Sequence, residues 1–412
     1  MATRPDNRRR SSSITQALRR VPLNQQGDKP LTPTNEEVKP LPAGKPRRKA
    51  GSSSFSYASK GFWNDIKTGR WMLVPASSFK ILAAEFALWA AIEVMLTRLD
   101  TTSKTPFNPL SFIRSHPSGH HWNPFSYLNL DAQHTYPNPM SYFLFPQGLL
   151  PNGMARKSWA DFVFVAQHII TWSFVRQFWC VLILPVIAKA LRVKRSKIMR
   201  FTEQGYAIVY FGIMGTIGVY VMKGLPTYWY QTEHFWLEYP HKSMTYELKA
   251  YYLLQAAYWV QQLLLLVARI EKPRKDFKEL VAHHIVTLWL IGWSYTIYLT
   301  HIGNAIYVTM DVSDIFLALA KCTNYVNETA SIPVFAFFVL VWTYFRHYLN
   351  IKILWSVYSQ FHLIPASERQ VFDPLNDKWM PPWMKWQIFT PILLLQFINL
   401  FWYFLILRIL AR

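Results

Sequence analysis

The chain has 412 residues, of which 51% are hydrophobic and 17% are aromatic. This composition excludes an intrinsically disordered protein, and the length exceeds that of one small module. The formal net charge of +21 would fit a nucleic-acid-binding protein, but the basic residues stand in short stretches beside apolar ones. That distribution favours a membrane protein without a nucleic-acid partner.

The N-terminal residues 1–70 are polar, basic and rich in proline and serine. They lack the apolar core of a secretory signal peptide. We therefore predict a disordered basic cytosolic tail over 1–70, whose charges could contact anionic lipid headgroups. A solvated tail without a dedicated partner is the simpler interpretation.

Apolar stretches of roughly 18 to 25 residues recur through the rest of the chain, which is the length that a helix needs to cross about 30 Å of hydrocarbon. They predict an all-α polytopic membrane protein with about eight transmembrane helices. The first stretch is the weakest, because Lys80, Glu85 and Glu93 interrupt it. The predicted spans are residues 79–97, 161–188, 203–222, 247–267, 280–299, 305–321, 332–349 and 386–409.

Basic stretches at 189–200 and 269–278 follow the second and fourth predicted spans. Because positively charged loops stay in the cytosol, an eight-span count places both termini there. The segments 98–158, 228–239 and 350–385 then lie on the lumenal side. The aromatic segment 228–239 is typical of an interfacial helix or a re-entrant piece, and the prolines in 350–385 exclude one continuous helix there.

The first lumenal segment contains His116, His120 and His121, a pattern similar to one histidine box of a membrane di-iron enzyme. One tract offers too few ligands for such a centre, so no metal site is expected. The two cysteines, Cys180 and Cys322, lie within or at the end of predicted spans and form no disulfide framework.

Ionisable residues mark the fifth and sixth predicted spans. His283 and His284 are adjacent in the fifth, and Asp311 and Asp314 lie in the sixth. An aspartate in a transmembrane helix costs about 2.5 to 3.5 kcal/mol on insertion scales, so four such groups indicate a functional site.

Each residue turns a helix by about 100°, so the numbering predicts which side chains share a face. The polar residues of three consecutive spans each fall within one arc, which predicts a single shared interior cavity. Alternatively, the Gln and Tyr side chains only join helices by hydrogen bonds, and Lys321 only reaches the headgroups. The three stripes are Tyr251, Gln255, Tyr258 and Gln262; His283, His284, Thr287, Ser294 and Tyr298; and Asp311, Asp314 and Lys321.

Histidine transfers protons near neutral pH and can itself be acylated. A carboxylate at the far ring nitrogen would fix its tautomer, and Asp314 is the better placed of the two to reach the histidines. The pattern does not name a substrate. A non-catalytic protein that binds lipid or assists translocation is one alternative. A transporter with a proton relay is another, although the inverted halves of many transporters are absent.

The stretch KELVAHHIVTLWLIGWSYTIYLTHIGNAIYVTMDVSDIFLALAKCTNY, residues 278–325, resembles the longevity-assurance motif of ceramide synthases. HFWLEYP from His234 and LKAYYLLQAAYWVQQ from Leu248 are similar to the segments that precede this motif in the family. The resemblance covers roughly residues 157–410, and its six C-terminal spans match a TLC domain. The polar leader and the extra first span resemble the fungal branch.

This resemblance implies a ceramide synthase of the endoplasmic reticulum, which transfers the acyl group of a fatty acyl-CoA to a sphingoid base. It implies His283, His284, Asp311 and Asp314 as catalytic residues, and no cofactor besides acyl-CoA as co-substrate. His283 would attack the thioester while His284 acts as general base, and direct transfer without an acyl-enzyme is the alternative. Three domains are predicted. The tail covers 1–70, and residues 71–200 form two N-terminal transmembrane helices with a long lumenal loop. Residues 201–412 form a catalytic TLC domain, built as a helical barrel around a buried cavity.

The basic loop before the fifth span, with Arg274, Lys275 and Lys278, is placed to meet the CoA phosphates, although the positive-inside rule alone also explains it. In the family the loop before the last span, here 350–385, determines chain length. The resemblance leaves open whether a small single-span accessory subunit or a second copy joins the chain.

Overall fold

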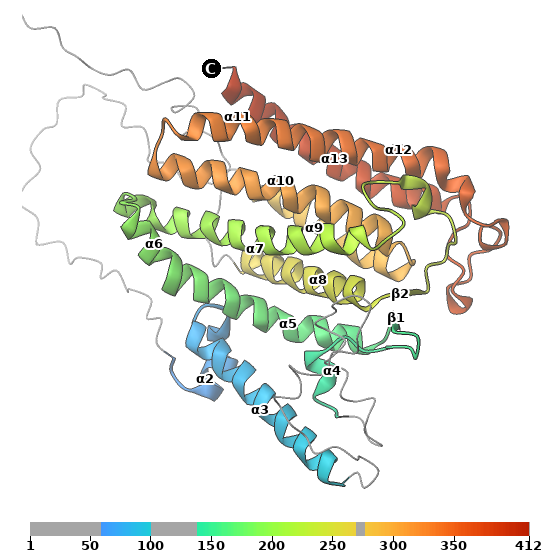
Figure 1. The fold of residues 1–412 in the computed structure, drawn as a ribbon, viewed down its shortest axis with the longest axis horizontal. Coiled ribbons are helices and arrows are strands. Elements are labelled where there is room, and N and C mark those ends of the chain that lie inside the picture. The colour runs from blue at the N-terminus through green and yellow to red at the C-terminus, as the bar shows by residue number, and fades with distance from the viewer. Residues whose placement is uncertain (1–58, 100–137, 269–276, 412) are drawn as a thin grey trace, which may run out of the picture.

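The computed structural model describes residues 59–99, 138–268 and 277–411 (Figure 1). These residues are mostly helical, which confirms an all-α membrane protein. In this part of the chain, five helical stretches are long and apolar enough to cross a membrane. They are Ala160–Ala190, Arg195–Lys223, Thr300–Val326, Ser331–Leu363 and Met384–Leu410.

The other three predicted spans are also helical, as α3 (Pro75–Leu99), α8 (Tyr246–Val267) and α9 (Phe277–Thr296). These three helices are more polar than the five stretches above and are not counted among them. The reason is their charged and polar side chains, since α3 carries Lys80, Glu85 and Glu93, and α8 and α9 carry polar stripes.

Part of the predicted tail is folded. Helix α2 (Phe62–Lys67) contains Asp65, whose carboxylate accepts hydrogen bonds from Ser77 Oγ at 2.6 Å and from the Lys60 amide at 3.0 Å. These bonds attach α2 to the start of α3, so the predicted disorder is wrong for residues 59–70. Residues 1–58 lie outside the described residues.

The central helices run side by side (Figure 1). α7 (Ile198–Lys223) packs along α10 (Thr300–Val326), and α5 (Ala160–Gln177) packs against α8, while α3 contacts α5 at one edge of the bundle. The approach of α7 to α10 is close, since a Cβ on Gly215 would lie 3.4 Å from the Asp311 Cβ.

Two π-helical segments interrupt the regular helices. Phe178–Ile183 joins α5 to α6 (Leu184–Ala190). Thr343–Leu349 joins α11 (Ser331–Trp342) to α12 (Asn350–Gln360).

The loop predicted from residue 350 therefore begins only after Gln360. The helix continues because the first proline of that segment is Pro365 and because Ile353 and Val357 are fully buried. The last helix, α13, spans Met384–Leu410. Short helical turns complete the connections at Arg70–Met72, Ser141–Leu144 (α4), Arg195–Lys197, Thr232–Phe235, Phe361–Leu363, Ala366–Glu368 and Pro374–Asn376.

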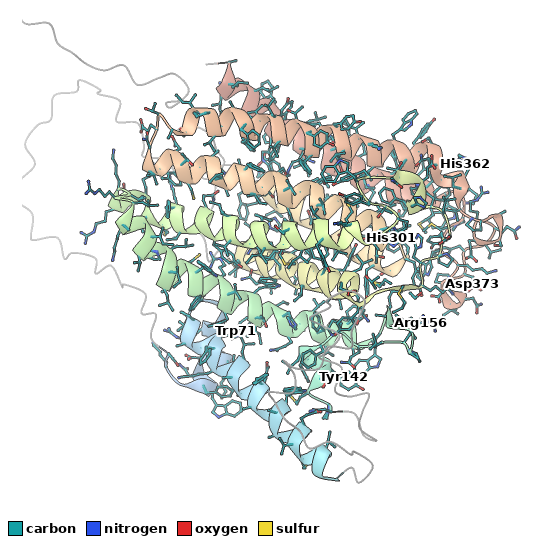
Figure 2. All side chains as sticks on the ribbon, in the orientation of Figure 1. Trp71, Tyr142, Arg156, His301, His362 and Asp373 are labelled. Carbon is teal, nitrogen blue, oxygen red and sulfur yellow. The ribbon has the colours of Figure 1, made fainter. Side chains whose placement is uncertain are left out.

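The end of the bundle predicted to be lumenal carries a small two-stranded sheet of β1 (Met154–Arg156) and β2 (Ser243–Thr245), paired antiparallel with Ala155 opposite Met244. Figure 2 shows Arg156, Asp373 and His362 at this end.

A buried lysine joins this small sheet to the helices. Lys249 of α8 donates to the carbonyls of Gln147 and Arg156, both at 2.5 Å, and lies 2.8 Å from Asp161 Oδ1 of α5. Gly148 has a φ of +81°, and a Cβ there would lie 2.5 Å from the Arg156 carbonyl oxygen, so only glycine fits. The lysine ties the loop before α5 to α8.

The aromatic segment 228–239 forms turns and a short helix, not a span. Phe235, Trp236 and Tyr239 are buried in a cluster with residues of the α9–α10 turn, α12 and α13, while Tyr228 and Trp229 are exposed. The segment therefore closes this end of the bundle. His116, His120 and His121 lie outside the described residues, and neither Cys180 nor Cys322 forms a disulfide in the described part of the chain.

Candidate active site

The two adjacent histidines lie on α9 and are both buried. The Trp259 ring of α8 is 5.7 Å from the His283 ring and 5.7 Å from the His284 ring, centroid to centroid. The Trp402 ring of α13 also packs against His283, with 5.3 Å between the ring centroids. The histidine pair therefore faces the interior between α8 and α13.

The two imidazoles have different hydrogen bonds. His284 Nδ1 lies 2.8 Å from the Leu280 carbonyl oxygen. Because a carbonyl only accepts, Nδ1 carries the proton in the neutral ring and Nε2 carries the lone pair. His283 Nδ1 has no hydrogen-bond partner among the described residues. The backbone thus holds one ring of the pair in a single tautomer.

A cavity of about 200 Å³, here called the polar cavity, opens beside the histidines toward the ends of α8 and α10 that are predicted to be cytosolic. It contains four of the ionisable residues singled out from the sequence: His283, His284, Asp314 and Lys321. Its other polar lining comes from Arg176, Glu203, Gln204, Tyr206, Tyr258, Gln262 and Arg346.

A second cavity of about 50 Å³, here called the apolar pocket, extends from His283 toward the opposite end of the bundle. Few polar side chains line this pocket, and they include Thr287, Ser294, Tyr252, Tyr307 and His283. Aliphatic side chains make up most of the wall: Leu290, Ile291, Ile297, Leu299, Ile302, Ile306, Ile388, Ile392 and Leu395. His283 and Trp259 are the two residues that line both cavities.

Asp314 forms a buried ion pair with Arg346, whose Nη2 lies 2.7 Å from Asp314 Oδ1. The guanidinium also donates to Ser313 Oγ at 2.6 Å and to Asn399 Oδ1 at 3.0 Å, and it stacks 4.2 Å from the Trp342 ring. Five fixed donors suit arginine to such a site. Asp314 is therefore held at the cavity wall by a counter-charge from the π-helical segment.

Asp311 lies outside both cavities. Its Oδ2 accepts a 2.5 Å hydrogen bond from Gln255 Nε2, and Gln255 also bonds to Tyr210 and Tyr251. The predicted single cavity thus divides into the polar cavity, the apolar pocket and a packed polar cluster of Tyr251, Gln255 and Asp311. Close helix packing at Gly215 and Gly218 leaves this cluster no open space.

The remaining predicted residues are distributed as follows. Tyr258 and Gln262 line the polar cavity. Tyr298 leaves the stripe because α9 ends at Thr296, and its hydroxyl donates to Asp377 at 2.9 Å in the loop before α13. Lys278 is exposed on the first turn of α9 and lines neither cavity. Arg274 and Lys275 lie outside the described residues.

Sequence reasoning missed Arg346, although a signal was present. The criterion that identified the histidines, an ionisable residue inside an apolar stretch, applies equally to Arg346 and His347 in the seventh predicted span. Trp259 and Trp402 carried no comparable signal, since tryptophan is common in membrane helices. In the described ranges, no group of three or more histidine, cysteine or acidic side chains is arranged to hold a metal ion.

Known proteins are similar to a large part of this chain. The family model described as "TLC domain" matches residues 200–408. A sphingosine N-acyltransferase of Schizosaccharomyces pombe is 45% identical over 252 residues, which cover 60% of this chain and 64% of the relative. A ceramide synthase of Saccharomyces cerevisiae is 42% identical over 254 residues, covering 61% of each chain.

A sphingosine N-acyltransferase-like protein of Gibberella moniliformis is 39% identical over 278 residues, covering 63% of this chain and 69% of the relative. The match to the two yeast proteins spans less than two thirds of their length. Since the domain match takes in half of the chain and all the described residues of the histidine and aspartate motif, this protein belongs to the TLC-domain family, where it resembles the fungal sphingosine N-acyltransferases.

Proposed function

We propose that this protein is a ceramide synthase, which transfers an acyl group from a fatty acyl-CoA to the amine of a sphingoid base such as sphinganine or phytosphingosine. The observation that carries the proposal is that His283 lies where the polar cavity meets the apolar pocket, with His284 beside it in the polar cavity. The names of the similar yeast proteins, a sphingosine N-acyltransferase and a ceramide synthase, support the same reaction.

The two cavities suit the two parts of the acyl donor. An acyl chain is stabilised in the apolar pocket by removal of its surface from water. CoA is a polyanion and belongs at the polar mouth, where Arg176 and Lys321 lie. The basic loop with Arg274 and Lys275, and Lys278 after it, would receive its phosphates. Neutralising that loop should raise the KM for acyl-CoA, and an unchanged KM would remove it from the proposal.

The reaction forms an amide from a thioester, so it needs positioning, an unprotonated amine and a catalyst for acyl exchange. His283 attacks the thioester carbonyl, a C–N bond forms and the C–S bond breaks, and the imidazole proton leaves with the CoA thiol. His284, with its Nε2 lone pair, takes the proton of the sphingoid amine as that amine attacks the acyl-imidazole, and passes it to the ring of His283 as the acyl–imidazole C–N bond breaks.

Asp314 lines the same cavity and balances the positive charge that develops on the histidines, while Asp311 supports the packing of α8 on α10. The proposed substrate contacts include Tyr258, Gln262 and Lys321 in the polar cavity and Thr287 and Ser294 in the apolar pocket.

One assay tests the activity. Purified protein or microsomes receive sphinganine and a series of acyl-CoAs, and ceramide is quantified by mass spectrometry. The double variant His283→Ala/His284→Ala is the control that separates catalysis from lipid binding. No ceramide from the wild type would refute the proposal. Intact mass after incubation with acyl-CoA alone separates the two mechanisms, since an adduct that His283→Ala abolishes indicates an acyl-enzyme.

For the membrane arrangement we propose eight spans in the endoplasmic reticulum membrane, with the six from α7 to α13 as a barrel around the cavities and both termini on the cytosolic side. The support is the placement of the basic turn at 189–200, the α10–α11 turn and the C-terminus at one end of the bundle (Figure 1). Protease protection of tags at the two termini in sealed microsomes tests this topology. Co-purification from native membranes tests for a single-span subunit or a second copy.

A further inference from the structure

Acyl transfer to an amine passes through a tetrahedral carbon that bears a negatively charged oxygen. Enzymes stabilise such an oxygen with fixed hydrogen-bond donors in a site that excludes water. The proposed function assigns no residue to this task. The donor must lie beside the reacting carbonyl, which is where the acyl chain ends and the CoA portion begins.

Only two of the described residues line both the polar cavity and the apolar pocket, namely His283 and Trp259. A thioester with its chain in the apolar pocket and its CoA in the polar cavity has its carbonyl at the junction of the two. Trp259 therefore lies at the same junction as His283, the ring proposed to attack, and beside the position of the developing oxyanion.

The indole of Trp259 carries an unpaired hydrogen-bond donor. Its side chain is 6% exposed, and its Nε1–H has no acceptor among the described residues. A buried donor without a partner costs about 1 to 3 kcal/mol, so it needs an explanation. The explanation here is an acceptor that arrives with the substrate.

Other buried tryptophans share the unpaired N–H but not the position. Trp342 and Trp402 line only the polar cavity, Trp293 lines only the apolar pocket, and Trp236 and Trp379 line neither. The ring centroids of Trp259 and His283 are 5.7 Å apart. The two rings meet edge to face at this distance, so a carbonyl at the junction of the cavities lies beside both of them.

We propose that Trp259 is a catalytic residue whose indole N–H donates a hydrogen bond to the acyl carbonyl oxygen as that oxygen becomes negative. This inference rests on the proposed acyl transfer. When His283 attacks, the carbonyl π electrons move to the oxygen, which Trp259 stabilises, and they return as the C–S bond breaks and the thiolate takes the imidazole proton. The same oxygen becomes negative when the amine attacks, with or without an acyl-enzyme.

The test uses the purified full-length protein with sphinganine and the saturated acyl-CoA that the wild type turns over fastest. Trp259→Phe removes the N–H and keeps an aromatic ring. Loss of one oxyanion donor lowers kcat by about 10²- to 10³-fold. Trp236→Phe is the matched control, since Trp236 is also a buried tryptophan with an unpaired N–H but lines neither cavity. It should keep wild-type kcat.

A second measurement separates catalysis from binding. The thioether analogue of the acyl-CoA has the same chain and CoA but no carbonyl oxygen, so its inhibition constant should change less than about threefold in Trp259→Phe. A second variant carries at position 259 a tryptophan analogue with sulfur in place of the ring N–H. It keeps the shape of the indole, so it should fold as the wild type does and lose kcat as Trp259→Phe does.

Three results would show that Trp259 does not stabilise the oxyanion. They are a kcat of Trp259→Phe near that of the wild type, an analogue inhibition constant that rises as much as kcat falls, or full turnover by the sulfur variant. Failure of the proposed function is distinguishable, since the wild type itself would then form no ceramide.

Discussion

Arg346 and Asp314 form an ion pair of 2.7 Å in which the arginine side chain is 2% exposed. Breaking a buried pair by removing one partner typically costs about 3 to 5 kcal/mol, because the other charge is left without compensation. Arg346→Met should therefore lower the free energy of unfolding by about this amount, measured by thermal or denaturant unfolding in detergent.

Two comparisons sharpen this prediction. Lys242→Met breaks an exposed pair with Asp377 and should cost at most about 1 kcal/mol. The double variant Arg346→Met/Asp314→Leu removes both charges and should regain stability while remaining inactive. Recovery of activity together with stability would show that Asp314 has only a structural role.

The apolar pocket predicts control of acyl length. Thr287 lines this pocket, whereas Ile285 on the same helix is 58% exposed on the outer surface. Thr287→Phe shortens the pocket, so the ceramide formed from a mixture of acyl-CoAs should shift toward shorter chains. Ile285→Phe is the matched control and should leave the distribution unchanged, as mass spectrometry of the products will show. Equal distributions from the two variants would contradict the assignment of the pocket to the acyl chain.

Gly303 leaves space for Tyr252. A Cβ at Gly303 would overlap the Tyr252 hydroxyl, which is hydrogen-bonded to Ser294 across the apolar pocket. Gly303→Ala should therefore destabilise the protein by about 1 to 3 kcal/mol through overpacking. Gly292, which lies in a helix and has nothing within 4 Å of its Cβ position, is the control. Gly292→Ala should be neutral or stabilise by about 0.5 to 1 kcal/mol.

A second substitution should relieve the overpacking that Gly303→Ala causes. Tyr252→Ala removes the atoms that the new methyl group would meet, so Gly303→Ala should cost less in that background than in the wild type. The melting temperatures of the four proteins in this cycle measure the coupling. Additive effects would exclude the steric explanation.

Lys157 should make stability depend on pH. It lies before α5, with Nζ 3.2 Å from the Tyr298 ring centroid, and it donates to the Thr296 carbonyl at 2.6 Å. Burial lowers the pKa of Lys157 from 10.5 to about 8, although Asp377 and Asp161 act in the opposite direction. Between these two values the unfolded chain binds the proton more tightly, so the contribution of Lys157 to stability rises with pH.

The measurement is the melting temperature of the wild type minus that of Lys157→Met. This difference should become more positive between about pH 7.5 and pH 9.5, as the folded-state lysine loses its proton first. A difference that stays constant over this range would contradict the lowered pKa.

The helical pattern was largely predictable, because a segment that crosses hydrocarbon must satisfy its own backbone hydrogen bonds and be apolar over most of its length. All eight predicted spans are helical. The misplaced boundaries have local causes, since α12 continues the seventh helix until the residues before Pro365, and residues 59–70 fold because Asp65 binds the start of α3. Neither cause can be predicted from the hydropathy of the sequence.

The sequence by itself determined the helical membrane architecture and pointed to the histidines and aspartates as a candidate site, because uncompensated ionisable groups are costly in a membrane. The tertiary structure alone decided which of these groups share a cavity. It brings Asp314 to the histidines and pairs it with Arg346 from a distant helix, packs Asp311 against Gln255 instead, and sets Trp259 beside His283. Helical periodicity predicts on which face of a helix a side chain lies. The neighbouring residue that this side chain contacts depends on how closely two helices approach, and small residues such as Gly215 and Gly218 set that distance.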